Sequence, residues 1–167
     1  MPTDTKPHRP VWAPALEALT SRRFIARGIL SKIAHRIDGP LLKLSRGRLS
    51  LTFGYPVLLL TTLGVKSHRY HTVPLLFVDR EDDAVAIIGT SFGSTKHPAW
   101  YYNLVAEPIC TVEIKGRRWQ TTAREATPDE REKIWAQAAR NYSGYDAYKD
   151  WTGGRIPPVF ILERLSG

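Results

Sequence analysis

The stretch "VLLLTTLGVKSHRYHTVPLLFV" (residues 57–78) contains two short apolar runs separated by a polar loop. The runs "VLLLTT" (57–62) and "TVPLLFV" (72–78) are rich in β-branched residues, which is typical of strands. About nine residues separate them, whereas a tight hairpin needs two. No acidic residue lies in this loop, and its polar residues include Lys66, Ser67, His68, Arg69 and His71. The stretch predicts a hairpin whose loop is longer and more basic than a simple turn requires.

The same strand pattern extends along the chain on both sides of this hairpin. We expect further strands at 48–53, 84–90, 109–114, 117–125 and 159–165, and helices at 97–107 and 127–140. "DREDD" (79–83) and Lys115-Gly116 indicate turns, and "TPDE" (127–130) is typical of a helix start with a capping box. Consecutive strands on short turns pair antiparallel, and about seven of them favour a small closed barrel of the α+β class.

The N-terminal third differs from the rest in charge. Residues 1–50 hold ten Lys and Arg against three acids, whereas residues 51–167 hold fourteen against thirteen. We expect a mobile tail at 1–20, a basic amphipathic helix at 21–47, and one globular barrel domain at 48–167. The helix carries isoleucines at every fourth position from Ile25 to Ile37. Its basic face is either simply solvated, or residues 21–37 contact an anionic membrane surface or an acidic ligand.

Composition argues against several classes of protein. A nucleic-acid role would need a basic stripe interleaved with exposed aromatics, which residues 51–167 lack. No apolar run approaches the roughly 20 residues of a membrane span, and the first ten residues lack the apolar segment of a secretory signal. The single Cys110 fits a buried thiol in a reducing, cytoplasmic setting. The five histidines have no tight ligand spacing beyond His68 and His71, so no metal is expected.

Three constellations of residues could bind a ligand. In the hairpin loop, Thr62, Gly64 and Ser67 offer hydroxyls and a permissive backbone, and Lys66, Arg69 and His71 offer positive charge. Such a loop makes an anion-binding concavity, or it is merely solvated, and composition does not decide between the two. No Walker lysine motif, Gly-x-Gly-x-x-Gly or Gly-x-Ser-x-Gly occurs in the chain.

The second constellation is "GTSFGSTKHPAWYYNL" (89–104). A strand ends there in a turn with Ser91, Gly93 and Ser94, and a helix then begins around His97, Pro98 and Trp100. Free N–H groups beside glycine suit a flat polar ring or a phosphate. The helix aromatics are alternatively core residues, an interpretation that fits Tyr101 and Leu104 better than Trp100.

The third constellation is a run of aromatics, Tyr142, Tyr145 and Tyr148, followed by Trp151. Spacings of three place them near one face of a helix or turn. Core packing is the common outcome for such a stripe. The intervening residues are polar, however, which favours a partly exposed aromatic lip over a pocket at least as strongly.

Three segments together resemble the deazaflavin (F420)-dependent nitroreductase family. These are "LLLTTLGVKSHRYHTVPL", "SFGSTKHPAWYYNLVAEP" and "NYSGYDAYKDWTGGRIPPVFILE", which match the family's "LLTTTGRKSGxxRxTPL", its "PAWYxNL" segment and its tyrosine-rich C-terminal stretch. The resemblance implies a split β-barrel that binds coenzyme F420, a flavin-like ring with an anionic tail. It implies that Lys66 and Ser67, in a turn shaped by Thr62 and Gly64, hold the phosphate. It places the ring against Ser91, Phe92, Gly93, Lys96, His97, Pro98, Ala99 and Trp100.

This chain departs from the family pattern in the hairpin loop. Many relatives carry arginine at the position of His71 and glycine at the position of His68. Arg69 could replace the charge of that arginine but not its position. Val65 replaces a common arginine. If His71 takes the arginine's role, its charge varies near neutral pH.

The resemblance also implies a reaction. A hydride would pass from reduced deazaflavin to a quinone or nitro-aromatic held beneath Tyr142, Tyr145, Tyr148 and Trp151, with Tyr142 or Tyr145 delivering the proton. Because quinones partition into membranes, the basic helix would dock the protein on the inner face of the cell membrane. The alternatives are a non-catalytic F420- or lipid-binding protein and a split-barrel protein that binds FMN.

Overall fold

The computed structural model describes residues 56–80, 83–141, 145 and 152–165. The predicted tail, the basic helix and the strand at 48–53 lie outside these residues.

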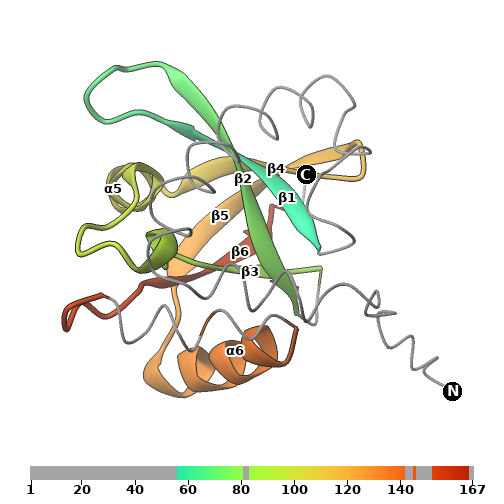
Figure 1. The fold of residues 1–167 in the computed structure, drawn as a ribbon. Coiled ribbons are helices and arrows are strands. Elements are labelled where there is room, and N and C mark those ends of the chain that lie inside the picture. The colour runs from blue at the N-terminus through green and yellow to red at the C-terminus, as the bar shows by residue number, and fades with distance from the viewer. Residues whose placement is uncertain (1–55, 81–82, 142–144, 146–151, 166–167) are drawn as a thin grey trace, which may run out of the picture.

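Six antiparallel strands close into a barrel in the order β1-β2-β3-β6-β5-β4 (Figure 1). The strands are β1 (Val57–Leu63), β2 (Tyr70–Asp79), β3 (Val85–Ile88), β4 (Ile109–Ile114), β5 (Arg117–Glu125) and β6 (Val159–Arg164). Pairing of β1 with β4 closes the ring, with Leu60 opposite Val112. The α+β class and the antiparallel split barrel predicted from the sequence are therefore confirmed.

The hairpins follow from local sequence. β1 and β2 stay paired from Val57 opposite Leu76 to Leu63 opposite Tyr70, so residues 64–69 form the connecting loop. The β4–β5 connection is two residues long, and both Lys115 and Gly116 have positive φ, 49° and 80°. That conformation is the one a two-residue hairpin turn requires to match the twist of its strands.

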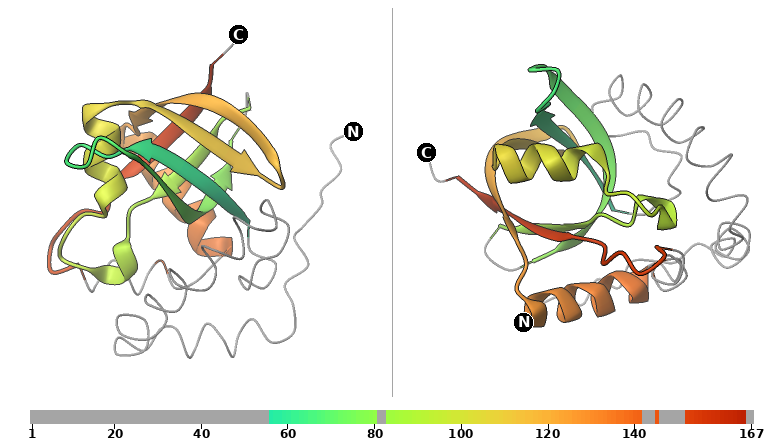
Figure 2. Two further views of the ribbon diagram at one scale, coloured as in Figure 1. Left: turned by 90° about the horizontal axis from the view of Figure 1, so that it is seen from above. Right: turned by 90° about the vertical axis from the view of Figure 1, so that its left-hand side faces the viewer.

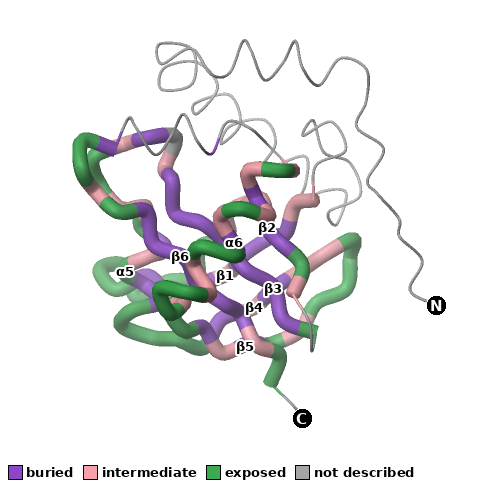
Figure 3. The backbone as a smooth tube through the Cα atoms, turned by 90° about the horizontal axis from the view of Figure 1, so that it is seen from below, coloured by how far each residue is buried: buried purple, intermediate pink, exposed green. Residues whose placement is uncertain are grey.

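Strand alternation produces two hydrophobic clusters. The first fills the barrel with inward-facing side chains, among them Leu60, Ile87, Val112 and Leu162, which are almost fully buried. Cys110 belongs to it as predicted, and burial raises the pKa of its thiol. The second cluster lies on the outer face of β2, β3 and β6, where a helix covers it. Figure 3 shows that buried residues concentrate along the strands and that most exposed residues lie in the connections and at strand ends.

In the part of the chain that the structure describes, two helices and a short 3₁₀ turn accompany the barrel. The 3₁₀ turn η3 (Ser91–Gly93) leads into α5 (Ala99–Ala106), and α6 (Pro128–Asn141) covers the second cluster. α6 begins with the predicted capping box: Thr127 N–H donates to a carboxylate oxygen of Glu130 at 2.9 Å, and Glu130 N–H donates to the Thr127 hydroxyl at 3.4 Å. Figure 2 shows α5 at one end of the barrel and α6 along its wall.

Candidate functional site

Four segments from three separate parts of the sequence gather at one end of the barrel. They are the hairpin loop at 64–69, the turn at 89–98, α5, and the segment at 152–158 that leads into β6 (Figures 1 and 2). Antiparallel order explains this, because β1, β3 and β6 all have an end there. Two of the three sequence constellations are therefore neighbours in space.

The hairpin loop has a closely bonded backbone. Gly64 N–H donates to Arg69 C=O and His68 N–H donates to Gly64 C=O, both at 2.8 Å. His68 adopts a left-handed conformation with φ of 52°, a region where a side chain is strained and glycine is not. This geometry gives a physical reason why glycine suits the position of His68.

Ser67 and His71 form a polar pair across the loop. The Ser67 hydroxyl lies 2.6 Å from Nε2 of His71, and both residues are exposed. Gly64 lies beneath the pair: a Cβ at this position would collide with the Ser67 hydroxyl and would lie 2.8 Å from the His71 ring. Glycine at position 64 therefore keeps the pair in place.

The cations of the loop are not neutralised within the described residues. Lys66 and Arg69 are exposed, and neither side chain has an ion-pair or hydrogen-bond partner in the described part of the chain. The sequence has no acidic residue between Asp38 and Asp79. An exposed ammonium and guanidinium beside a hydroxyl and an imidazole form a donor set suited to an anion.

Asn103 of α5 connects the hairpin to the helix. Its amide nitrogen donates to the Thr62 hydroxyl at 2.9 Å, and its amide oxygen accepts from Val65 N–H at 3.2 Å. Asn103 and Thr62 are both buried, so the predicted role of Thr62 in shaping the turn has a direct structural counterpart. Asn103 was not among the predicted site residues. The sequence cue that could have identified Asn103 is that it is one polar residue on the buried side of an otherwise apolar helix.

The turn at 89–98 offers unused donors. Ser91 and Gly93 have positive φ, 49° and 71°. Among the described residues, neither the N–H nor the hydroxyl of Ser91 has a hydrogen-bond partner, and the residue is half-buried. Lys96 is exposed, and its backbone N–H donates to the Ser94 hydroxyl at 3.1 Å. Phe92 lies in η3, and its side chain is outside what the structure describes.

Arg155 holds this turn from the side of the C-terminal segment. Its guanidinium donates to three backbone carbonyls at 2.8–3.0 Å, those of Gly89, Thr90 and Ser94. Burial lowers the pKa of Arg155, although an arginine remains charged. Arg155 was not among the predicted site residues; its sequence signal was a basic residue shortly before the buried prolines Pro157 and Pro158.

His97 lies between this arginine and α5. Its ring stacks on Tyr101 with centroids 4.3 Å apart and an interplanar angle of 20°. Nδ1 of His97 lies 3.4 Å from Nη1 of Arg155. Burial, and then the charge of Arg155, lower the pKa of His97, whereas Glu125 opposes the shift. The imidazole is therefore favoured in its neutral form.

Trp100 is a buried core residue, although core packing looked less convincing for it than for Tyr101 and Leu104; its contact with the ring stays a prediction. Its side chain is 6% exposed and meets Phe160 edge to face at 6.1 Å. The helical period explains this placement, because Trp100, Asn103 and Leu104 share the buried face of α5. Leu104 is buried as predicted, and Tyr101 packs at the edge of the same cluster. Pro98 is the N-cap of α5, and Ala99 is exposed.

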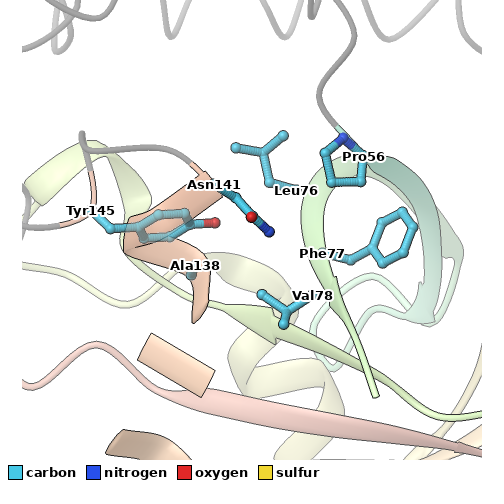
Figure 4. Close-up of a pocket in the computed structure, with 7 residues that line it drawn as sticks. All are labelled: Pro56, Leu76, Phe77, Val78, Ala138, Asn141 and Tyr145. Carbon is cyan, nitrogen blue, oxygen red and sulfur yellow. The ribbon is translucent and has the colours of Figure 1, made fainter. Parts of the chain in front are cut away.

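Tyr145 is also buried, at 6% exposure, which differs from a partly exposed lip. It meets Trp135 of α6 edge to face at 5.9 Å, within the cluster that α6 covers. Figure 4 shows it beside a cavity that Leu76, Phe77 and Asn141 help to line. The cavity volume is about 10 Å³, room for about one water molecule and too small for a ring. Tyr142, Tyr148 and Trp151 lie outside the described residues.

Two further properties bear on the class of site. The described residues hold no group of three or more His, Cys, Asp or Glu side chains that could bind a metal ion. Of the helices that the structure describes, none is long and apolar enough to cross a bilayer.

The fold and the site define a split-barrel protein with a cationic loop and a donor-bearing turn at one end. More specifically, the chain belongs to the F420H(2)-dependent quinone reductase family, whose model matches residues 36–164. An F420H(2)-dependent quinone reductase of Mycobacterium tuberculosis is 29% identical over 143 residues, which cover 84% of this chain and 86% of that protein.

Two solved structures are similar as well. An F420-H2 dependent reductase (FDR-A) is 38% identical, with a TM-score of 0.59, and the match covers 65% of this chain and 94% of that one. A structure described as a domain-swapped dimer is 32% identical, with a TM-score of 0.61 and coverage of 80% and 98%. Family membership and the split-barrel fold agree with the resemblance seen in the sequence.

Proposed function

We propose that this protein is an F420H2-dependent quinone reductase whose cofactor spans the hairpin loop and the turn at 89–98. The observation that carries the proposal is the family match over residues 36–164, which contains both segments. Their convergence at one end of the barrel supports a single site. The cofactor is F420 by family, and the reaction is an oxidoreduction.

The donor set of the loop fits an anionic tail. Lys66 and Arg69 would oppose the negative charges, and Ser67 with His71 would donate hydrogen bonds to the phosphate. A charge-assisted hydrogen bond contributes about 1.5–3 kcal/mol, more than the 0–1 kcal/mol of an exposed ion pair. No acidic residue occurs in the loop sequence itself, so no like charge within the loop would repel the tail.

The turn at 89–98 would hold the ring. Ser91 has a free N–H and hydroxyl among the described residues, which are suited to a ring carbonyl. Gly93, Lys96, Pro98 and the exposed Ala99 surround it in sequence, and the buried Trp100 supports the helix behind them. When bound, reduced F420 supplies a hydride and little one-electron chemistry. The protein's part is to orient the reactants and exclude water.

The acceptor and its proton source are the less constrained part of the proposal. We place a quinone beneath the tyrosine segment, with Tyr142 or Tyr145 delivering a proton. The burial of Tyr145 weighs toward Tyr142. Tyr142→Phe should therefore lower quinone turnover more than Tyr145→Phe does. If both variants turn over quinones at the wild-type rate, neither phenol has this role.

Two finer proposals accompany the main one. Nitro-aromatics are flat, activated two-electron acceptors, so we propose that the same site reduces them. Residues 21–37, with their basic amphipathic pattern, would bring the protein to anionic bilayers where quinones dissolve. Sedimentation with vesicles of anionic lipid tests this second idea, and equal recovery with neutral vesicles would contradict it.

Fluorescence titration of the purified protein with oxidised F420, with FMN as the comparison, tests the cofactor assignment. Mixing with reduced F420 and a quinone then tests turnover. Tight F420 binding with loss of the reduced cofactor supports the proposal. F420 binding with no transfer to any acceptor would favour a binding protein, and preferred binding of FMN would favour a flavoprotein.

A further inference from the structure

The contact between Arg155 and His97 determines which ring nitrogen of the histidine carries a proton. A guanidinium has only donors, so the ring nitrogen that faces it at 3.4 Å must be an acceptor. A neutral imidazole with an acceptor at Nδ1 carries its proton on Nε2. The stack of His97 on Tyr101 fixes the plane of the ring. Nε2–H is therefore a donor of fixed tautomer and orientation on a half-buried side chain.

Arg155 does more than a structural clamp needs to do. Three of its hydrogen bonds close the turn by binding the carbonyls of Gly89, Thr90 and Ser94. The contact with His97 is a fourth interaction. Within the described residues, no carboxylate pairs with the guanidinium.

We propose that Arg155 is a positioning residue of the reductase site and that His97 is a hydrogen-bond donor to the acceptor. Arg155 holds the turn and donates toward the lone pair on Nδ1 of His97. Nε2–H of His97 then donates a hydrogen bond to an oxygen of the substrate, a quinone or nitro compound, and this oxygen gains negative charge during reduction. The identity of the ligand rests on the proposed function, whereas the tautomer of His97 does not. No proton leaves His97 in this role.

The charged and titratable groups around His97 agree with a neutral donor. Arg155 lies at the contact distance above, and Tyr101 and Tyr102 flank the ring at 4.3 Å and 6.2 Å between centroids. Lys96 precedes it in the chain. Glu125 alone acts to raise the pKa of His97, and it is outweighed by burial and Arg155. The neutral form of His97 is therefore favoured relative to that of an ordinary histidine.

The first test uses the cofactor-free protein, so it does not depend on the proposed function. Nitrogen-15 NMR of histidine should show Nδ1 of His97 unprotonated and Nε2 protonated at pH 7, with a titration midpoint below the ordinary 6.5. In Arg155→Gln the midpoint should rise and the tautomers should mix. A wild-type proton on Nδ1 would overturn the inference.

The second test separates the donor from the stack. His97→Phe keeps a ring against Tyr101 but has no donor, and quinone kcat should fall about tenfold. His97→Asn should recover activity, because its amide oxygen accepts from Arg155 and its nitrogen donates. Equal kcat in His97→Phe and wild type would overturn the donor role. Failure of wild type to bind F420 would refute the proposed function and leave the NMR result standing.

Discussion

Breaking the bond between Thr62 and Asn103 is the sharpest test of how the hairpin loop is held. The bond is 2.9 Å long and buried at both ends. A neutral buried hydrogen bond contributes about 0.5–1.5 kcal/mol, and a donor or acceptor left unpaired costs about 1–3 kcal/mol. Thr62→Val should therefore destabilise the protein by about 1–3 kcal/mol, because the Asn103 amide nitrogen loses its acceptor.

Asn103→Ala should cost more than Thr62→Val, about 2–4 kcal/mol, because the Thr62 hydroxyl and Val65 N–H both lose their partner. The two changes share one bond, so the double variant should be less destabilised than the sum, by a coupling of about 1 kcal/mol. Urea unfolding measures all three. F420 affinity should fall in each variant, because the loop loses its attachment to α5.

Thr61→Val is the matched control. Thr61 is the neighbouring threonine of β1, and its hydroxyl bonds Thr72 at 2.9 Å rather than Asn103. Its effect should add to that of Asn103→Ala within about 0.3–0.5 kcal/mol. If the effect of Thr62→Val adds to that of Asn103→Ala just as fully as the effect of Thr61→Val does, then α5 does not hold the loop through this bond and the reasoning is wrong.

Three further predictions concern single positions. Gly64→Ala should weaken F420 binding about tenfold with little change in melting temperature, because its Cβ displaces the mobile ends of Ser67 and His71 rather than backbone; equal affinity would contradict the role of this pair. His68→Gly should stabilise the protein by about 0.5–1 kcal/mol in urea unfolding, because it relieves the positive φ of 52°, and a loss of stability would refute the strain. The Arg124 guanidinium donates two hydrogen bonds of 2.8 Å to the Glu130 carboxylate and is the main reason that the pKa of Glu130 is lowered to about 2. The stability that this pair contributes is present above pH 4.5 and should be lost as the pH falls toward 2. Glu130→Gln should flatten that decline, and parallel pH curves would count against it.

The elements that sequence predicted well depend on local chemistry. The turn at Lys115-Gly116, the capping box of Thr127 and Glu130, and the alternation of the strands each follow from neighbours in the chain. Local signals of this kind give the hairpins and the barrel. The hairpin loop could also be recognised from the sequence as a candidate anion-binding loop, because it contains basic residues and no acidic residue.

What sequence could not give depends on contacts between distant segments. Asn103 meets residues about 40 positions earlier, and Arg155 meets carbonyls about 60 positions earlier, so neither bond is visible as a local pattern. The polar turn before Trp100 made core packing look less convincing for this residue, whereas the helical period directs its side chain to the buried face of α5. Tyr145 packs against Trp135 of α6, ten residues earlier in the chain, and this ring contact was not visible in the polar residues that surround Tyr145 in the sequence.

The central claim is that the hairpin loop binds the anionic tail of F420 through Lys66 and Arg69. It is tested most directly by F420 titration of Lys66→Gln beside Lys115→Gln, an equally exposed lysine at the β4–β5 turn. Lys66→Gln should weaken binding by about tenfold or more, as the loss of one charge-assisted bond requires, and Lys115→Gln should leave it within about twofold. Equal affinity of the two variants would contradict the account.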